Sequence, residues 1–169
     1  MKNELMQLPV ATRDGDFIAG YSANGLASLN FPAKRSAKKK SSTTVPPKVR
    51  AWHRLTTAAL QRALSARPFG SLPPLDQSGG TDFQRAVWSA MRKIRAGGTK
   101  SYGEIAKEIR KPKAVRAVGG ACGANPIPIF VPCHRVLAAN GKIGGFSGGL
   151  EWKKLLLERE GVSVNQAHV

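Results

Sequence analysis

The sequence predicts an α+β protein of two lobes, a small antiparallel β-sheet with a helix followed by a mainly helical lobe. Three observations indicate this: strand-like alternation in the first 31 residues, a Pro- and Gly-rich stretch at 68–80, and a series of capped helices after it. A chain of 169 residues is long enough for two small lobes. We place an N-terminal lobe at 1–78, a C-terminal lobe at 79–163 and a polar tail at 164–169.

The strands are expected at residues 8–12, 17–21 and 26–31. The first two are separated by Asp14-Gly15 and the last two by Asn24-Gly25. Both dipeptides supply the positive φ that tight hairpin turns require. The pattern therefore predicts a three-stranded antiparallel meander.

A helix is expected to begin at Pro47 and to end before Pro68. Proline suits the first helical position because its φ is already helical and its missing N–H needs no partner there. The apolar face that the helical period predicts consists of Val49, Trp52, Leu55, Ala59 and Ala63.

The C-terminal lobe carries stronger helix signals. Thr81 with Gln84 and Ser101 with Glu104 are capping boxes that open two helices, and Gly97-Gly98 ends the first of them. Pro112 is expected to begin a third helix. This helix is small-sided and basic, and with the preceding short helix it predicts a helix-turn-helix.

The segment from Asn125 to Val136 leads to a cysteine through an apolar run. Its three prolines cannot donate backbone hydrogen bonds, so we expect a rigid, shaped ribbon and not a regular central strand. The last helix is expected at 150–160, with Trp152, Leu155 and Leu156 as its apolar contribution.

The charge balance indicates a polyanionic partner. Lys and Arg number 27 against 10 Asp and Glu, which gives a net charge of +17. Such a surface attracts polyanions over about 8 Å at physiological salt, and nucleic acid is the leading class because phosphate contacts release counterions. The alternatives are a basic protein without such a partner and a protein that binds anionic membranes.

The connection at 33–46 is basic and rich in Ser and Thr. No acidic residue occurs between Asp16 and Asp76. Such a run is usually a solvated flexible loop, and a role in steering the protein toward DNA is the alternative. The sequence leaves both readings open.

Cysteine content and hydropathy point to the cytoplasm. The two cysteines, Cys122 and Cys133, form no CxxC pair, which argues against a disulfide framework and for a reducing compartment. No apolar stretch approaches the roughly 20 residues that span a bilayer. Residues 1–8 lack the apolar core of a secretory leader. We expect no membrane association.

Cys133 is the candidate nucleophile, whereas Cys122 shares a helix with alanines and reads as a small buried hydrophobe. A thiol with a pKa of roughly 8.5 needs a neighbour that favours the thiolate. The adjacent His134 can accept the proton, and a carboxylate can hold the resulting imidazolium. Neighbouring residues of an extended chain point to opposite sides, so either a turn or a bridging water is needed.

The C-terminal lobe resembles the O6-alkylguanine-DNA alkyltransferases. The signature is Pro132-Cys133-His134-Arg135-Val136, and the resemblance extends from residue 81 to about 161 in the family's order and spacing. The further matching segments are 101–103, 114–120, 123–126, 145–150 and 156–161.

The resemblance implies DNA repair by direct, irreversible transfer of an alkyl group from O6-alkylguanine, and from O4-alkylthymine, to Cys133. His134 would be the base acting through a water, and Glu160 would orient it. Asn125 would brace the turn that carries the cysteine, and Tyr102 would donate a hydrogen bond to N3 of guanine, where negative charge develops. Because a thioether has no ready leaving group, each molecule would react once.

The resemblance also implies how DNA is held. Arg116 would fill the stack after the damaged nucleotide flips out, while the helix-turn-helix enters the minor groove. The further DNA contacts would come from Ser101, Ala114, Val115, Gly119 and Arg135, and the base pocket would be lined by Pro128, Val136, Phe146, Ser147 and Gly148. We expect a monomer on double-stranded DNA with no cofactor. A zinc site is not expected, because no cysteine precedes Cys122.

Three other functions are compatible with parts of the sequence. A cysteine hydrolase would use the same residue types but would turn over and would not need a basic helix-turn-helix. A damage-binding protein on this scaffold would not need the reactive cysteine. A transcription factor would leave the Cys133 segment unexplained.

Overall fold

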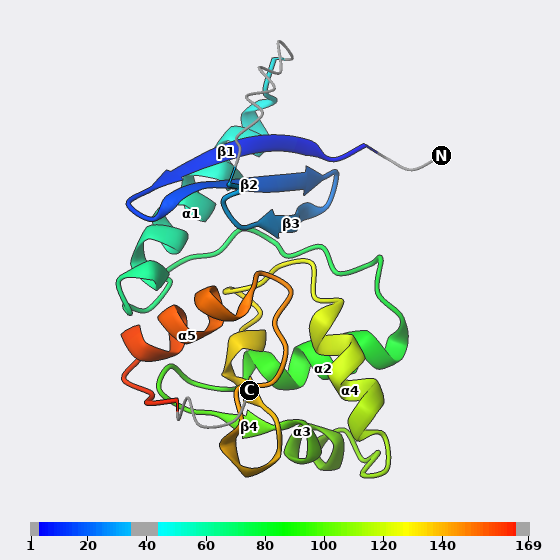
Figure 1. Ribbon diagram of the computed structural model, residues 1–169. Helices are drawn as coiled ribbons and strands as arrows, with labels where there is room; N and C mark the ends of the chain where they lie inside the picture. The colour runs from blue at the N-terminus through cyan, green and yellow to red at the C-terminus, as the bar shows by residue number, and fades with distance from the viewer. Residues whose placement is uncertain (1–3, 35–43, 165–169) are drawn as a thin grey trace.

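The computed structural model describes residues 4–34 and 44–164, which form the two lobes that the sequence predicts (Figure 1). The fold class is thereby confirmed. Most of the basic connection and most of the C-terminal tail lie outside these described ranges, so the expectations for them stay predictions.

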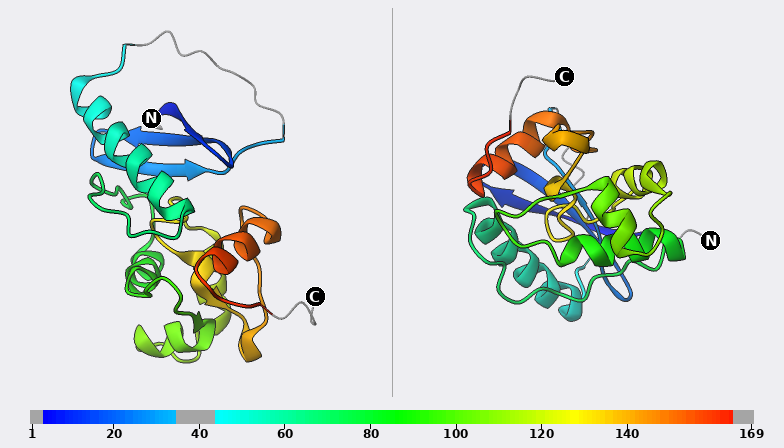
Figure 2. Two further views of the ribbon diagram at one scale, coloured as in Figure 1. Left: turned by 90° about the vertical axis from the view of Figure 1, so that its left-hand side faces the viewer. Right: turned by 90° about the horizontal axis from the view of Figure 1, so that it is seen from below.

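The N-terminal lobe is the expected meander packed against one helix. Strands β1 (Met6–Thr12), β2 (Gly15–Ser22) and β3 (Gly25–Asn30) pair antiparallel in the order β1-β2-β3. Helix α1 (Pro47–Leu64) begins with Pro47 and lies along one face of this sheet (Figure 2). Its buried face includes Thr56, Leu60 and Leu64, whereas Leu55 is 36% exposed, so the expected position of Leu55 in the core is wrong.

The C-terminal lobe contains four helices around the cysteine segment. They are α2 (Asp82–Arg92), α3 (Tyr102–Glu108), α4 (Val115–Gly123) and α5 (Leu150–Arg159). Both capping boxes are formed, at Thr81 and at Ser101. Helix α4 begins at Val115, so the expected start at Pro112 is wrong. Residues 110–113 form the turn instead, where Arg110 adopts a positive φ of 60°.

Two short strands that the sequence did not reveal connect two segments of this lobe. β4 (Lys100–Ser101) pairs in parallel with β5 (Val136–Leu137). Two residues carry too little pattern to predict a strand. The pairing fixes the start of α3 beside the chain that leaves the cysteine segment.

The two lobes share a continuous core. Phe31 follows β3 and its ring lies 5.0 Å from that of Trp152 in α5, while Phe17 of β2 lies 5.4 Å from the same indole. The stretch at 68–80 is more than a linker, because Leu26 donates to the carbonyl of Pro74 (2.8 Å) and accepts from the amide of Asp76 (2.8 Å). The N-terminal sheet is thus attached to the lobe that carries the cysteine.

Candidate active site

A tight turn delivers the cysteine, and Asn125 closes this turn. The Asn125 side chain donates to the carbonyl of Val131 (2.8 Å) and accepts from the amide of Ile127 (3.0 Å). Ile129 inside the turn has a φ of 74°, which is strained for a β-branched residue. The buried bridging amide offsets this strain by satisfying two backbone groups that would otherwise lack partners.

Cys133 begins a single 3₁₀ turn, η1 (Cys133–Arg135). In a 3₁₀ turn consecutive side chains are about 120° apart, whereas in an extended chain they would point to opposite sides. Cys133 is 4% exposed, and burial raises the pKa of its thiol, while a hydrogen bond from Asn125 and the charge of Lys153 act in the opposite direction. The resting thiol is therefore protonated at neutral pH.

His134 and Arg135 share the carboxylate of Glu160 at the end of α5. His134 Nε2 lies 3.0 Å from Glu160 Oε1. The Arg135 guanidinium donates from Nη2 to Oε1 (2.7 Å) and from Nε to Oε2 (3.0 Å), and its Nη1 donates to the carbonyl of Ile94 (2.7 Å). The Glu160 side chain is 8% exposed, so these partners replace its water.

The charges of this group fix the protonation state of His134. Burial alone would raise the pKa of Glu160, but the hydrogen bonds from His134 and Arg135 and the positive charge of Arg135 lower it to about 2. An ionised carboxylate can only accept, so Nε2 of His134 must carry the proton. Burial lowers the pKa of His134. The imidazole is therefore neutral, with the lone pair on Nδ1.

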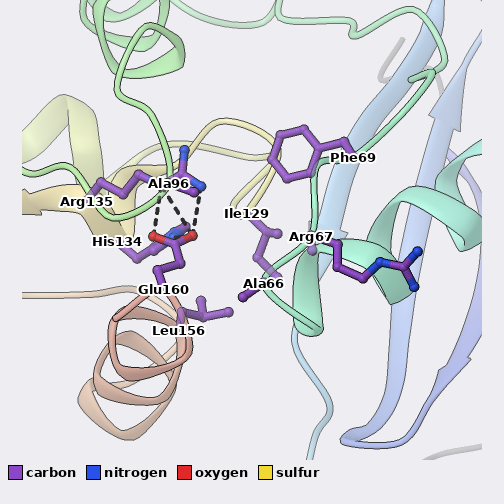
Figure 3. A pocket seen from close by; sticks show the side chains of 10 residues that line it. Ala66, Arg67, Phe69, Ala96, Ile129, His134, Arg135, Leu156 and Glu160 are labelled. Carbon is purple, nitrogen blue, oxygen red and sulfur yellow. Dashed lines mark hydrogen bonds and ion pairs between the residues drawn. The ribbon is translucent and has the colours of Figure 1, made fainter. Parts of the chain in front are cut away.

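Nδ1 of His134 is buried and has no hydrogen-bond partner among the residues that the structure describes. A buried acceptor of this kind is normally satisfied by protein or water. A cavity of about 20 Å³ lies against His134, Arg135 and Glu160 (Figure 3). Its other walls include Ala63 and Ala66 at the end of α1. The end of α1 thus borders the same cavity as the His134–Glu160 pair.

Lys153 is a site residue that sequence reasoning missed. Its side chain is fully buried, and its ammonium donates to the carbonyls of Val136 (2.7 Å) and Gly145 (3.2 Å). Burial lowers its pKa to about 8, and a thiolate at Cys133 or Cys122 would act against this shift. The signal was the i, i+3, i+4 spacing of Lys153, Leu156 and Leu157, which are the buried residues of α5.

The expected apolar face of α5 was therefore partly wrong. Leu156 is buried as expected, but Trp152 and Leu155 are only half-buried. The helix turns its lysine inward because two backbone carbonyls need a donor there. The core face is consequently rotated away from the one that hydrophobicity alone predicts.

Tyr102 lies against the loop at 143–149. Burial raises the pKa of Tyr102, with the thiols of Cys122 and Cys133 acting in the same direction and a hydrogen bond from the backbone of Gly145 opposing. A side chain at Gly144 would come within 2.8 Å of the Tyr102 oxygen. The structure therefore brings Tyr102, Cys133 and Lys153 to one side of this loop.

Three of the expected pocket residues, Phe146, Ser147 and Gly148, lie in this loop, and Pro128 and Val136 lie outside it. Pro128 and Val136 are buried, and Ser147 is exposed. The ring of Phe146 lies 5.5 Å from that of Phe31. Gly148 also lies against Phe31, where an added Cβ would clash at 2.5 Å. Phe31 is thus a second residue that sequence reasoning missed, a contact from the N-terminal lobe to the loop.

Of the residues expected to contact DNA, all but Arg135 lie on α4, directly before it, or at the start of α3. Ala114, Val115 and Arg116 lie at the start of α4, where Val115 is 41% exposed and Arg116 is also exposed. Ser101 caps α3, with its hydroxyl accepting from the amide of Glu104 (3.1 Å). Gly119 is half-buried on α4.

Arg135 does not belong with these residues. It is buried, and its guanidinium is taken up by Glu160 and the carbonyl of Ile94. The expectation that it contacts DNA is wrong, because a phosphate would have to displace these buried partners. Arg135 instead helps to keep Glu160 ionised.

Two further features concern ligands and membranes. Within residues 4–34 and 44–164, no three His, Cys, Asp or Glu side chains gather as metal ligands would. Over the same ranges, no helix combines the length and the apolar character that crossing a bilayer requires.

The C-terminal lobe matches the family model described as "6-O-methylguanine DNA methyltransferase, DNA binding domain" over residues 82–162. A methylated-DNA–protein-cysteine methyltransferase of Methanosarcina acetivorans is 57% identical over 82 residues, which are 48% of this chain and 53% of that protein. The chain spans about half the length of the curated relatives it matches.

Solved structures match over both lobes. The crystal structure of Mycobacterium tuberculosis OGT in complex with DNA superposes with a TM-score of 0.72 at 37% identity and covers 90% of each chain. The Mycobacterium tuberculosis O6-methylguanine methyltransferase structure has a TM-score of 0.71 at 34% identity, covering 97% of this chain and 96% of that one. Because these matches extend over nearly the full length of both partners, the chain belongs to the O6-methylguanine-DNA methyltransferase family.

Proposed function

We propose that this protein repairs DNA by moving an alkyl group from O6 of guanine to the sulfur of Cys133. The observation that carries the proposal is the arrangement of the turn at 133–135. It places a protonated thiol one residue from a neutral imidazole whose Nε2–H is committed to Glu160 and whose Nδ1 has no partner within the described residues. This is the arrangement that a general base requires.

The reaction conserves atoms and charge. The thiol proton passes to Nδ1 of His134 through a water, and Glu160 stabilises the imidazolium. The thiolate then forms an S–C bond to the alkyl carbon as the C–O6 bond breaks. The electron pair of the broken bond remains on guanine, which takes up a proton, so thiol and alkylguanine become thioether and guanine.

The other residues around the loop at 143–149 support the leaving group and the sulfur. The Tyr102 hydroxyl, held un-ionised by burial, donates to N3 of guanine as charge develops there. The Lys153 ammonium favours the thiolate over the thiol. Because Cys133 is 4% exposed, the loop must move to admit the base between Tyr102, Pro128, Val136, Phe146, Ser147 and Gly148.

DNA is held by α3 and α4 acting as a helix-turn-helix in the minor groove. The first turn of α4 presents Val115 and Arg116 to solvent, and the glycines that follow let the backbone approach the sugar-phosphate chain. The alkyl carbon inside a duplex is out of reach of a buried sulfur, so the nucleotide must be flipped out, and Arg116 fills the gap. We extend the substrate class to O4-alkylthymine and expect a monomer on double-stranded DNA.

The test is mass spectrometry after mixing the protein with excess duplex that contains O6-methylguanine. One methyl group should be found on Cys133 and no further DNA should be repaired, because a thioether has no ready leaving group. Cys133→Ser should abolish transfer but retain DNA binding, and Cys122→Ser is the matched control that should react normally. A methyl group on Cys122, or multiple turnovers, would refute the proposal.

A further inference from the structure

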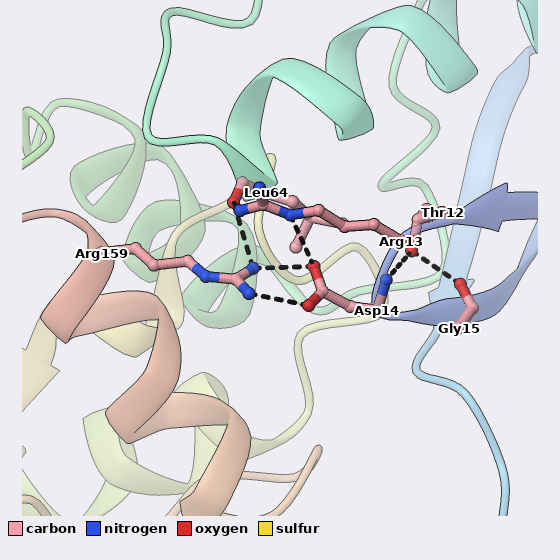
Figure 4. Close-up of polar contacts among 6 residues, drawn as sticks. All are labelled: Thr12, Arg13, Asp14, Gly15, Leu64 and Arg159. Atoms are coloured by element: carbon pink, nitrogen blue, oxygen red, sulfur yellow. Dashed lines mark hydrogen bonds and ion pairs between the residues drawn. The ribbon is translucent and has the colours of Figure 1, made fainter.

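An ion pair joins the two lobes at the residue next to Glu160 (Figure 4). The Arg159 guanidinium donates from Nη1 to Asp14 Oδ2 (2.7 Å) and from Nη2 to Asp14 Oδ1 (2.7 Å). Its Nη1 also donates to the carbonyl of Leu64 (3.0 Å). Arg159 is therefore bound at once to the β1–β2 turn and to the last residue of α1.

The geometry of this pair makes it more than a loose surface contact. The two side chains are 23% and 15% exposed, and two parallel hydrogen bonds fix the orientation of the guanidinium. The hydrogen bond from Arg159 lowers the pKa of Asp14, so the carboxylate stays ionised. Exposed single-contact pairs have neither property.

Arg159 ends α5 and Glu160 follows as the capping residue of that helix. Their side chains extend to different partners: Arg159 reaches the N-terminal lobe, and Glu160 reaches His134 and Arg135. The end of α1 to which Arg159 is tied also lines the cavity behind Glu160. A shift of the last turn of α5 would therefore move the carboxylate relative to the imidazole.

Other contacts already hold the lobes together. Phe31 and Phe17 pack on Trp152 at the start of α5, and the amide of Leu29 donates to the carbonyl of Pro126 (2.9 Å). These contacts secure the first turn of α5 and the cysteine segment. The far end of α5, which carries the carboxylate, is secured to the N-terminal lobe by Arg159.

We propose that the Asp14–Arg159 pair positions Glu160 for the reaction at Cys133, so that the N-terminal lobe contributes to alkyl transfer through its first hairpin turn. The proposal rests on the alkyl transfer proposed above. Asp14 and Arg159 act through Glu160 and do not touch the substrate. The expected loss is that of a positioning contact, roughly 2- to 30-fold in the rate constant of transfer.

The experiment measures the single-turnover rate of methyl transfer from O6-methylguanine duplex for Asp14→Asn and Arg159→Lys. The rate constant of transfer should fall by roughly 2- to 30-fold in Asp14→Asn. It should fall less in Arg159→Lys, which retains the charge without the two parallel hydrogen bonds. Arg13→Ala is the matched control, since Arg13 also contacts Asp14 and the Leu64 carbonyl but does not touch α5. The DNA affinity of all three variants should stay within about twofold of the wild-type value, because α4 is remote from the Asp14–Arg159 pair.

A double-mutant cycle with Glu160→Gln separates positioning from general loosening of the fold. If the pair acts through Glu160, Asp14→Asn should cost little further rate in the Glu160→Gln background. Equal losses in both backgrounds, or a full rate for Asp14→Asn, would overturn the positioning role alone. Absence of methyl on wild-type Cys133 would overturn the proposed function itself, and this proposal with it.

Discussion

Replacing Glu160 by Gln tests the centre of the site with a change of one atom. The carboxylate accepts from His134 and twice from the guanidinium of Arg135, and its side chain is 8% exposed. The amide keeps the shape of the side chain but has one acceptor oxygen instead of two and no charge. Arg135 is then a buried cation without its counter-charge.

The size of the effect can be estimated in two ways. The pKa of Glu160 falls from 4.5 to about 2, which at about 1.4 kcal/mol per pH unit corresponds to about 3 kcal/mol of folding free energy. Removing one partner of a buried ion pair costs about 3–5 kcal/mol. The two agree, and a loss of 3 kcal/mol would lower Tm by roughly 6–12 °C in a chain of this length.

The pH dependence has a definite sign. A carboxyl whose folded pKa is depressed contributes stability that is fully present above its unfolded pKa of 4.5 and is lost as pH falls toward about 2. The difference in free energy of unfolding between wild type and Glu160→Gln should therefore be constant from pH 5 to pH 7. It should shrink between pH 4.5 and pH 2.

Urea unfolding at a series of pH values measures this difference, and the single-turnover rate of methyl transfer follows the chemistry. The rate should fall by roughly 100-fold or more, since general-base catalysis contributes that much. Glu158→Gln is the matched control, because Glu158 is exposed and only approaches Lys154 at 3.9 Å. A Glu160→Gln protein as stable as Glu158→Gln at pH 7 would refute the reasoning about the buried network.

Three further changes test other parts of the site. Asn125→Ala should cost about 2–4 kcal/mol, because it leaves the Val131 carbonyl and the Ile127 amide without their partner; a Tm shift under 2 °C would contradict this. Lys153→Met should slow transfer, and since the lysine pKa is about 8 in the fold, the wild type should gain stability relative to the variant from pH 8 to 10.5; a constant difference would argue against a buried charge. Arg116→Ala should slow transfer from duplex DNA more than reaction with a free-base analogue, and equal losses would remove Arg116 from nucleotide flipping.

Features that depend on local chemistry could be predicted from the sequence. The Asp14-Gly15 and Asn24-Gly25 turns predicted the meander. Two capping boxes predicted where α2 and α3 begin. In each case the residues that determine the structure lie within four positions of one another. The candidate site was likewise predicted from a few adjacent residues, those of the signature around Cys133.

Features that depend on distant partners could not be predicted. Lys153 is buried because two backbone carbonyls from the cysteine segment and the loop at 143–149 converge on it. Arg135 is buried with its guanidinium on Glu160, although the resemblance implied a DNA contact for it. Helix α4 begins three residues after Pro112, because backbone hydrogen bonds from Lys111 to Ala106 and from Ala114 to Lys111 hold 110–113 in an exposed turn that the helix-start preference of proline did not reveal.

The resting state of the site bears on the proposed single-turnover transfer. Burial keeps the Cys133 thiol protonated and 4% exposed, so ordinary electrophiles in solution meet an unreactive sulfur. The base of the proposed transfer is already prepared, since Glu160 fixes the tautomer of His134 before any substrate arrives. What remains is access, and we propose that it opens when the loop at 143–149 leaves its contacts with Phe31 and Lys153. In the proposed function, the flipped nucleotide would supply the binding energy for this step, which a small electrophile cannot. Under the proposed mechanism, the buried site would thus reserve a single-use sulfur for alkylated bases in DNA.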